Sequence, residues 1–342
     1  MGMPRWKVWL LVYWPEREDI VHRLEAASCE VVLGRSLMNN KHYTEDELVE
    51  QIADIDGLMV ATGELITRRV MGAAKKLKVI SKVGRGVEQI DVNAATELGI
   101  LITNTVTELN TISTAEYAVA MILATAKKFK LADHNARLGL WRSVSNILLR
   151  NKTVGIIGLG RIGSKVAQLL QPFEIRLLAC SPHASAEKAE MLGVELTDME
   201  TLLKESDFIT LHAVQNEETR GLIGKAQIRL MKPTAYIINT ARGGLIDVAA
   251  LAGGLRDGQI AGAALDVFEP EVPQPGHPLL DEGFHFQTLY SPHVAGLNPD
   301  NDWQIAIVQM ENCINALNGK IPESTVNPDV LPKWQERFKS TK

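Results

Sequence analysis

The stretch Thr153-Val154-Gly155-Ile156-Ile157-Gly158-Leu159-Gly160-Arg161-Ile162-Gly163 decides the fold of this chain. An apolar strand runs into a G-x-G-x-x-G pattern, and the pattern opens a helix. Gly158 permits the tight turn, Gly160 lets the backbone approach a pyrophosphate, and Gly163 lets helix and strand pack closely. The N-terminus of the helix favours anionic charge. This strand–turn–helix context predicts a dinucleotide-binding unit rather than a plain structural turn.

Strand and helix patterns alternate on both sides of this stretch. Apolar runs predict strands at 8–13, 30–33, 57–60, 78–83, 101–103, 154–157, 177–179, 208–211, 235–239 and 262–266. Helical patterns fall between them at 19–27, 45–52, 68–74, 162–170, 187–191, 225–230 and 249–258, and a last helix covers 303–317. This rhythm predicts an α/β fold with parallel sheets that carry helices on both faces.

A long helix is expected from about Ser113 to about Arg137. Ser113 and Glu116 fit a capping box, in which each side chain satisfies a free N–H group at a helix start. Gly139 and Trp141 then open a connector. At the other end of the chain, the polar and basic segment from Pro332 is expected to be loosely held.

The composition limits the class of function. A chain of 342 residues is long enough for two domains with separate cores. The formal charge of −5 makes nucleic acid and anionic membranes poor partners. The apolar run Val8–Trp14 is too short to span a bilayer, and no cleavage site follows it. The three cysteines have neither disulfide nor zinc spacing, so a reducing compartment, the cytoplasm, is expected.

The segment about 20 residues after the glycine motif bears on cofactor choice. A carboxylate there binds the ribose hydroxyls of NAD and repels the 2′-phosphate of NADP. Here the strand ends in Ser181-Pro182-His183. Ser181 does not repel phosphate and can donate a hydrogen bond. No arginine follows as a clamp, although His183 and Lys188 are near, so the choice between NAD and NADP stays open.

Three further loops follow predicted strands. They are Asn239–Gly244 with Arg242, Asp266–Glu271 with its carboxylates, and Ser291–Gly296 with His293. Ligands of open parallel sheets bind outside the carboxyl ends of the strands, where all three loops are expected.

With these loops, the chain resembles the D-isomer-specific 2-hydroxyacid dehydrogenase family, which includes phosphoglycerate, glycerate, phosphite and formate dehydrogenases. The resemblance runs from about Lys7 to Asn327. Its motifs occur in the family's order and approximate spacing, at Asp91–Asn104, Gly158–Gly163, Asn239–Asp247, Gly262–Glu271 and Ser291–Gly296.

The resemblance implies a role for each matching residue. Arg242 matches the arginine that holds the substrate carboxylate, and His293 matches the general acid/base. Glu271, rather than Glu269, matches the partner of the histidine, because it stands five places after Asp266. Candidate cofactor-binding residues are Gly158, Gly160, Arg161, Ile162, Gly163, Ser181, Thr240, Ala241, Asp266 and Gly296. The backbone N–H groups of the loop containing Val83, Gly84 and Arg85 match those that receive the substrate carboxylate.

The chemistry of the three catalytic candidates is consistent with these roles. Reduction of a 2-oxo acid develops negative charge on the carbonyl oxygen, where a proton must arrive. Histidine suits that task because it titrates near neutral pH, and a neighbouring carboxylate favours its charged form. Arginine offers a permanent charge and a fork that matches a carboxylate. No ligand cluster suggests a metal, and the chemistry needs none.

Two departures from the family pattern bear on the substrate. The segment 60–63 lacks the arginine with which phosphoglycerate dehydrogenases tend to bind phosphate, although Arg85 could compensate. Formate dehydrogenases lack the partner carboxylate, so Glu271 argues against formate. The resemblance leaves the particular 2-oxo or 2-hydroxy acid open.

The resulting hypothesis is an NAD(P)-dependent enzyme with two doubly wound parallel-sheet domains. A Rossmann cofactor domain, 104–294, is inserted into a flavodoxin-like substrate domain made of 1–103 and 295–335, and 336–342 form a tail. Relatives imply a homodimer built around the helix from Ser113. Two alternatives remain: a non-catalytic protein of the same fold that senses NAD(H), and a purely structural dimerisation module.

Overall fold

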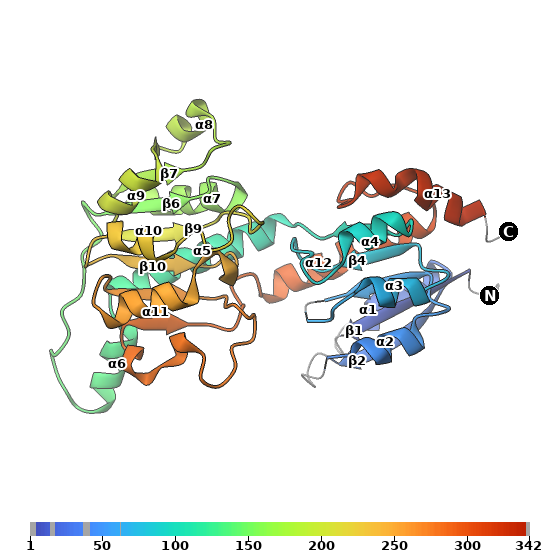
Figure 1. The fold of residues 1–342 in the computed structure, drawn as a ribbon, viewed down its shortest axis with the longest axis horizontal. Helices are drawn as coiled ribbons and strands as arrows, with labels where there is room; N and C mark the ends of the chain where they lie inside the picture. Colours follow the sequence, from blue (N-terminus) through green and yellow to red (C-terminus); the bar gives the residue numbers. More distant parts are fainter. Residues whose placement is uncertain (1–4, 14–17, 37–41, 62, 340–342) are drawn as a thin grey trace. The chain divides into compact units, whose positions relative to one another are not determined.

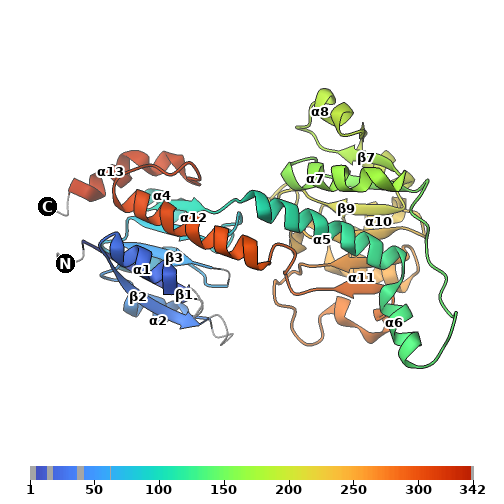
Figure 2. The same ribbon diagram turned by 180° about the vertical axis from the view of Figure 1, so that it is seen from behind.

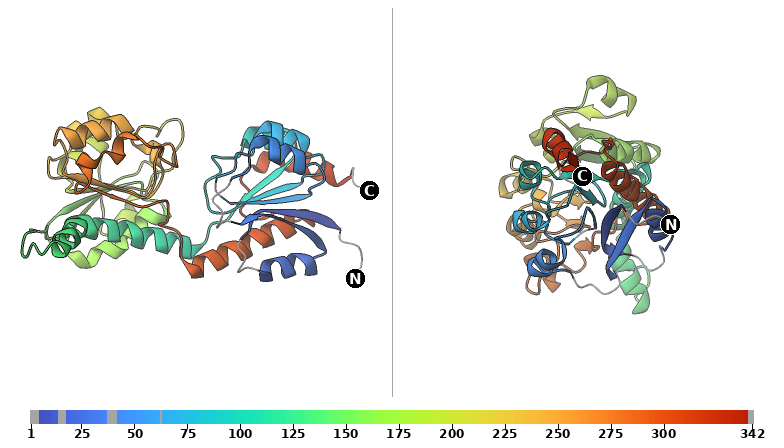
Figure 3. Two further views of the ribbon diagram at one scale, coloured as in Figure 1. Left: turned by 90° about the horizontal axis from the view of Figure 1, so that it is seen from below. Right: turned by 90° about the vertical axis from the view of Figure 1, so that its right-hand side faces the viewer.

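The computed structural model describes residues 5–13, 18–36, 42–61 and 63–339 and divides the chain into two compact units. One unit consists of Met1–Thr107 with Pro299–Lys342, and the other of Glu108–Asn298. Each unit contains one parallel sheet with helices on both of its faces (Figures 1 and 3). The predicted fold class is confirmed.

The first unit contains a five-stranded sheet in the order β2-β1-β3-β4-β5. All of its strand pairs are parallel, and the order is that of flavodoxin-like folds. Its strands are β1 (Trp6–Tyr13), β2 (Cys29–Ser36), β3 (Gly57–Val60), β4 (Val79–Lys82) and β5 (Leu101–Asn104). Its helices are α1 (Glu18–Ala26), α2 (Glu45–Gln51), α3 (Arg68–Ala73), α4 (Val92–Glu97), α12 (Pro299–Leu317) and α13 (Leu331–Lys339).

Separate apolar clusters cover the two faces of this sheet. Leu48 of α2, Val70 of α3 and Ala94 of α4 belong to one cluster. Leu24 of α1 and Cys313 of α12 belong to the other. Strands β3 and β4 are buried along their whole length, as expected for strands that are covered on both sides.

The second unit contains a seven-stranded parallel sheet in the order β12-β11-β10-β9-β6-β7-β8. Numbered from β6, this is the doubly wound Rossmann order with one added strand. The strands are β6 (Thr153–Ile157), β7 (Arg176–Cys180), β8 (Glu195–Leu196), β9 (Phe208–Leu211), β10 (Tyr236–Asn239), β11 (Gly262–Leu265) and β12 (Thr288–Tyr290). The helices are α5 (Glu108–Ala126), α6 (Phe129–Arg137), α7 (Arg161–Leu170), α8 (Ala186–Met191), α9 (Met199–Glu205), α10 (Lys225–Leu230) and α11 (Val248–Arg256).

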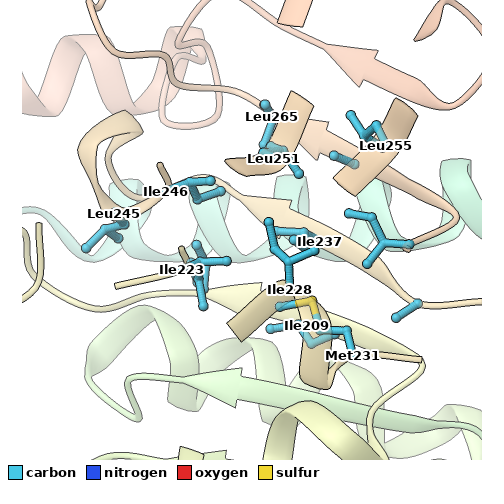
Figure 4. Packing of buried hydrophobic residues seen from close by; sticks show 14 of the residues in the cluster. Ile209, Ile223, Ile228, Met231, Ile237, Leu245, Ile246, Leu251, Leu255 and Leu265 are labelled. Carbon is cyan, nitrogen blue, oxygen red and sulfur yellow. The ribbon is translucent and has the colours of Figure 1, made fainter. Parts of the chain in front are cut away.

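Both faces of this second sheet are packed. Helices α5 and α7 cover one face, which is turned toward the viewer in Figure 2. The other face packs under α10 and α11, and Figure 4 shows part of this cluster. Ile237 of β10 and Leu265 of β11 meet Ile228 of α10 and Leu251 of α11 there. This rigid frame holds the carboxyl ends of the strands in place.

The long helix expected from Ser113 to Arg137 is wrong in two respects. Helix α5 begins at Glu108, and the capping pattern lies inside it, where the hydroxyl of Ser113 donates to the carbonyl of Ala295 (2.9 Å) instead. The helix also ends at Ala126, because Lys128 takes a left-handed conformation (φ 51°) before α6 begins. The hydroxyl therefore makes a tertiary contact rather than a helix cap.

The expected tail also needs correction. The chain remains helical to Lys339, because Trp334 and Phe338, one helical turn apart, pack against the first unit. Trp334 is 1% exposed, and its ring lies 5.1 Å from that of Phe338. Residues 340–342 and Trp14 lie outside the described part of the chain.

The sequence pattern did not predict helices α4 and α9, but each begins with a recognisable capping residue. Asp91 caps α4 by accepting from the N–H of Ala94 (2.8 Å), and Asp198 caps α9 by accepting from the N–H of Thr201 (2.8 Å). Both helices are short, so their apolar periodicity is weak, and an aspartate at the cap was the usable indication.

Candidate active site

Strand register gathers most of the predicted site residues at one edge of the second sheet. Ile157 pairs with Cys180 and with Leu211, Leu211 with Asn239, and Asn239 with Leu265. Leu265 in turn pairs with Tyr290. The residues that directly follow this row are Gly158, Ser181, His212, Thr240, Asp266 and Ser291. Segments far apart in the sequence therefore begin their loops side by side.

The glycine-rich loop sits where the strand order reverses, between β6 and β9. Gly158 has a φ of +96°, and a Cβ there would lie 2.8 Å from the backbone of His212 and Ala213. A Cβ on Gly163 would lie 2.1 Å from the carbonyl oxygen of Gly158, whereas one on Gly160 would meet nothing within 4 Å. Two glycines thus permit tight packing, and the third leaves open space above the loop.

This loop fits a dinucleotide cofactor. Gly160 precedes the first turn of α7, so the helix N-terminus lies beside the open space, and Arg161 at its start is exposed while Ile162 is half-buried. At the end of β10, the hydroxyl of Thr240 is buried and has no hydrogen-bond partner within the described residues. A bound nucleotide would occupy the open space and offer the hydroxyl of Thr240 a hydrogen-bond partner.

The turn that carries Arg242 is built by Asn239. The side-chain oxygen of Asn239 accepts from the N–H of Ala241 (3.0 Å), and its amide group donates to the carbonyl of Arg242 (2.8 Å). The guanidinium of Arg242 donates to the carbonyl of Ala241 (2.8 Å) and is partly exposed. The sequence analysis assigned no role to Asn239, although an asparagine that begins a turn is a recognisable signal.

Asp266 organises the loop that carries the histidine. It is 1% exposed, and its carboxylate accepts from the hydroxyl of Ser291 (2.5 Å) and the N–H groups of Val294 (2.9 Å) and Ala295 (3.0 Å). Its carbonyl accepts from the N–H of His293 (2.7 Å). Both carboxylate oxygens thus bond the histidine loop, and the cofactor contact that the resemblance implied for Asp266 stays a prediction.

His293 and Glu271 are in contact. The Nδ1 atom of His293 is hydrogen-bonded to Oε1 of Glu271. The nearby Glu269 instead faces Arg220 (3.4 Å). His293 holds a left-handed backbone conformation (φ 55°), which the bonds from Asp266 to both sides of it support. With Nδ1 bonded to a carboxylate, the other ring nitrogen, Nε2, is the one that can exchange a proton with a ligand.

Gly296, another predicted residue, and His212 both lie near these loops but make other contacts. A Cβ on Gly296 would lie 2.4 Å from the amide nitrogen of Asn110, so this glycine allows the histidine loop to approach α5. His212, at the end of β9, bonds Thr210 through Nε2 (2.9 Å), and burial lowers its pKa to about 4. The backbone of His212 lies beside Gly158, while its neutral imidazole packs against Thr210.

The predicted substrate loop belongs to the first unit. The N–H of Val83 donates to the carbonyl of Val60 (2.9 Å), and the N–H of Gly84 to the hydroxyl of Thr105 (2.6 Å). Both N–H groups have acceptors within the unit in this structure, and the expectation that they receive a carboxylate stays a prediction. The carbonyl of Arg85 accepts from Asn104 (2.9 Å), and the side chain of Arg85 is exposed.

Two features of the described residues bear on the function classes. No group of three or more His, Cys, Asp or Glu side chains that could hold a metal ion is found in that part of the chain. None of the helices described there is both long and apolar enough to cross a membrane.

Comparison with known proteins gives consistent matches. Residues 119–295 match the model of the D-isomer specific 2-hydroxyacid dehydrogenase NAD-binding domain. The chain is 37% identical to a D-3-phosphoglycerate dehydrogenase of Archaeoglobus fulgidus over 94% of its length, but it spans only 60% of that relative. It is also 37% identical to a glyoxylate reductase of Aeropyrum pernix, over 86% of this chain and 89% of the relative.

A solved structure shares the fold over almost the whole chain. The D-lactate dehydrogenase of Aquifex aeolicus, solved with NAD and lactic acid, covers 94% of this chain and 99% of its own. The sequences are 26% identical, and the TM-score is 0.79. The NAD-binding match falls on the unit that contains the glycine loop and the histidine loop, which confirms the prediction of an NAD(P) cofactor.

Proposed function

Because the chain belongs to the D-isomer-specific 2-hydroxyacid dehydrogenase family, we propose that it transfers a hydride between NAD(P)(H) and a small 2-oxo or 2-hydroxy acid of D configuration. The observation that carries this proposal is the bonded pair of His293 and Glu271 at the edge that also holds the glycine loop. A protein that only sensed the cofactor would not require this pair. The alternative of a sensing protein is therefore less well supported.

The proposed division of roles follows from the side-chain chemistry. When bound, the nicotinamide cofactor supplies or accepts the hydride. His293 donates the proton to the oxygen of the substrate carbonyl, and Glu271 orients the imidazole through its bond to Nδ1. Arg242 holds the substrate carboxylate through its forked guanidinium. Asp266 is a positioning residue, since it holds the loop and makes no contact with the reacting atoms in this scheme.

The experiment that tests the proposal is a steady-state assay of the purified protein. Glyoxylate, hydroxypyruvate, pyruvate, oxaloacetate and branched 2-oxo acids are each offered with NADH and with NADPH. Consumption of the reduced cofactor with at least one acid is expected. Cofactor binding without turnover on any of these acids would favour the sensing protein instead.

A substitution of Arg242 tests whether this residue binds the substrate carboxylate. Arg242→Lys keeps the charge but loses the fork, so turnover is expected to fall by ~10²-fold or more. Arg220→Lys is the matched control, because Arg220 contacts Glu269 at the surface and has no proposed role. Near-normal activity of Arg242→Lys would place the clamp elsewhere.

Assembly is a further part of the proposal. No residue of α6 is buried, and Phe129, Leu138 and Trp141 are 60%, 61% and 81% exposed. Large apolar side chains exposed along one segment in this way are typical of a protein interface. We therefore propose a homodimer through this part of the second unit, burying roughly 2,000 Å² or more. Light scattering at micromolar concentration should give twice the mass of the chain, and a monomer would contradict it.

A cytoplasmic location also stays a prediction.

A further inference from the structure

We propose that Lys188 and Ser181 form a binding site for the 2′-phosphate of NADP(H), so that the protein prefers NADP(H) over NAD(H). This inference rests on the proposed function, because it concerns the adenosine end of the same cofactor site. The sequence analysis left this choice open, since no arginine follows Ser181. The contacts of Lys188 in the second unit now give that end of the site a positive charge.

Lys188 reaches the glycine-rich loop from α8. Its ammonium donates to the carbonyl of Leu159 (2.8 Å), which lies between the first two glycines of the motif. Helix α8 follows β7 and sits beside it in both ribbon views (Figures 1 and 2). The side chain of Lys188, eight positions after the end of β7 at Cys180, thus returns to the loop that the sequence assigned to the cofactor.

Ser181 lies at the end of β7, next to the glycine-rich loop. The N–H of Gly158 donates to the carbonyl of Cys180 (3.0 Å), so the glycine loop and the end of β7 are joined by a hydrogen bond. Ser181 is the next residue and is half-buried. Ser181 and Lys188 therefore both border the turn at Gly158 and Leu159. In doubly wound folds the adenosine ribose is recognised at the end of this strand.

The charge at this position suits a phosphate. An ammonium has three donors, and the carbonyl of Leu159 takes one of them. No carboxylate forms an ion pair with Lys188 among the residues that the structure describes. Residues 181–183 contain no acid that would repel a phosphate. A serine hydroxyl and an ammonium can both donate to a phosphate. The uncharged hydroxyls of an NAD ribose gain little from the ammonium.

A purely structural role for Lys188 predicts something different. If the ammonium served only to hold the loop through Leu159, its loss would weaken NADH and NADPH binding equally. If it binds the 2′-phosphate, only the phosphorylated cofactor suffers. Because lysine is a point charge without the fork of arginine, we expect a preference of ~10–100-fold rather than complete exclusion of NAD.

The test is equilibrium binding of defined probes to the 342-residue chain by calorimetry. Adenosine 2′,5′-bisphosphate should bind ~10–100-fold more tightly than adenosine 5′-monophosphate, and NADPH more tightly than NADH. Lys188→Gln should bring each pair within about threefold while NADH binding stays unchanged. Lys188→Arg should restore the preference. Lys204→Gln is the matched control, because Lys204 lies on α9 and pairs with Glu200 at the surface.

Ser181→Asp gives an independent variant at the same site. It should weaken binding of the bisphosphate by at least ~10-fold through charge repulsion and leave the monophosphate nearly unaffected. Equal loss of NADH and NADPH binding in Lys188→Gln would overturn the inference, as would equal affinity of the native protein for both probes. Those results leave the proposed function intact, whereas failure to bind any nicotinamide cofactor would overturn both.

Discussion

The glycine-rich loop at Gly158–Gly163 and the histidine loop at Ser291–Gly296 leave the same edge of one sheet, yet different interactions shape them. The glycine loop is shaped mainly by residues within it, because Gly158 and Gly163 allow a backbone approach that any Cβ would block. In the histidine loop, Gly296 permits the approach to α5, but contacts from outside the loop hold the rest of its backbone. A buried carboxylate, Asp266, holds it from the end of the neighbouring strand. One loop is therefore encoded locally, and the other depends on a distant partner.

Removing the chemistry of the histidine loop should have the largest effect. His293→Gln loses the proposed proton donor, so turnover is expected to fall by ~10²–10⁴-fold. Binding of the reduced cofactor should stay nearly unchanged, because the glycine loop is untouched. His285→Gln is the control, since His285 is exposed in the same unit and packs edge-on against Phe286. Native turnover in His293→Gln would remove the proposed role.

Loosening the histidine loop should have the next largest effect. Asp266→Asn loses an acceptor and places an amide beside N–H donors, which should lower turnover by ~10–100-fold and the free energy of unfolding by about 1–3 kcal/mol. A positioning role predicts that kcat falls more than KM rises and that the pH profile shifts. Asp247→Asn, at the exposed cap of α11, is the control. Unchanged kcat with reduced stability alone would make Asp266 merely structural.

The glycines test whether the other loop is really local. Gly158→Ala meets backbone atoms at 2.8 Å and keeps a positive φ, so the free energy of unfolding should fall by about 1–3 kcal/mol. Gly160→Ala meets no atom within 4 Å and should leave stability almost unchanged while weakening cofactor binding. Chemical denaturation and cofactor titration separate the two effects. Equal destabilisation by both variants would show that the loop depends on more than its own geometry.

The smallest expected effect is the pH dependence of stability that His212, next to the glycine loop, contributes. Burial lowers the pKa of His212 to about 4, from an ordinary 6.5, so the unfolded chain binds a proton that the folded protein refuses between these values. The free energy of unfolding should therefore fall as the pH drops from 6.5 to 4. Because the residue is only partly shielded, we expect about 1–2 kcal/mol rather than the full shift.

A matched pair of variants isolates this contribution. His212→Gln should flatten the decline below pH 6.5, and His22→Gln, at an exposed position, should leave it as it is. Urea unfolding at pH 5 and pH 8 measures the difference. An equally steep decline in His212→Gln would assign the acid sensitivity to other groups.

Much of the fold was predictable because its signals are short in range. Apolar runs and glycines located the phosphate loop and the strands, except the short β8 and β12, within one or two residues at most ends, as at β3 and β9. The weak points were also local in origin. Ser113 and Glu116 fit a helix start but lie inside α5, because the hydroxyl bonds Ala295 of the histidine loop. A capping pattern cannot reveal that its hydroxyl has a tertiary partner.

By itself, the sequence determined the α/β alternation, the glycine loop and the residue types that follow each strand, because backbone sterics and apolar patterning act over a few neighbours. Only the tertiary structure decided which of those residues meet. Strand register brought Gly158, Asp266 and Ser291 to one edge, the carboxylate of Asp266 bonded the histidine loop, and Lys188 turned back to Leu159. Such pairings depend on distances between segments that the chain order does not contain, because buried polar groups bond whichever partner the packing brings within reach.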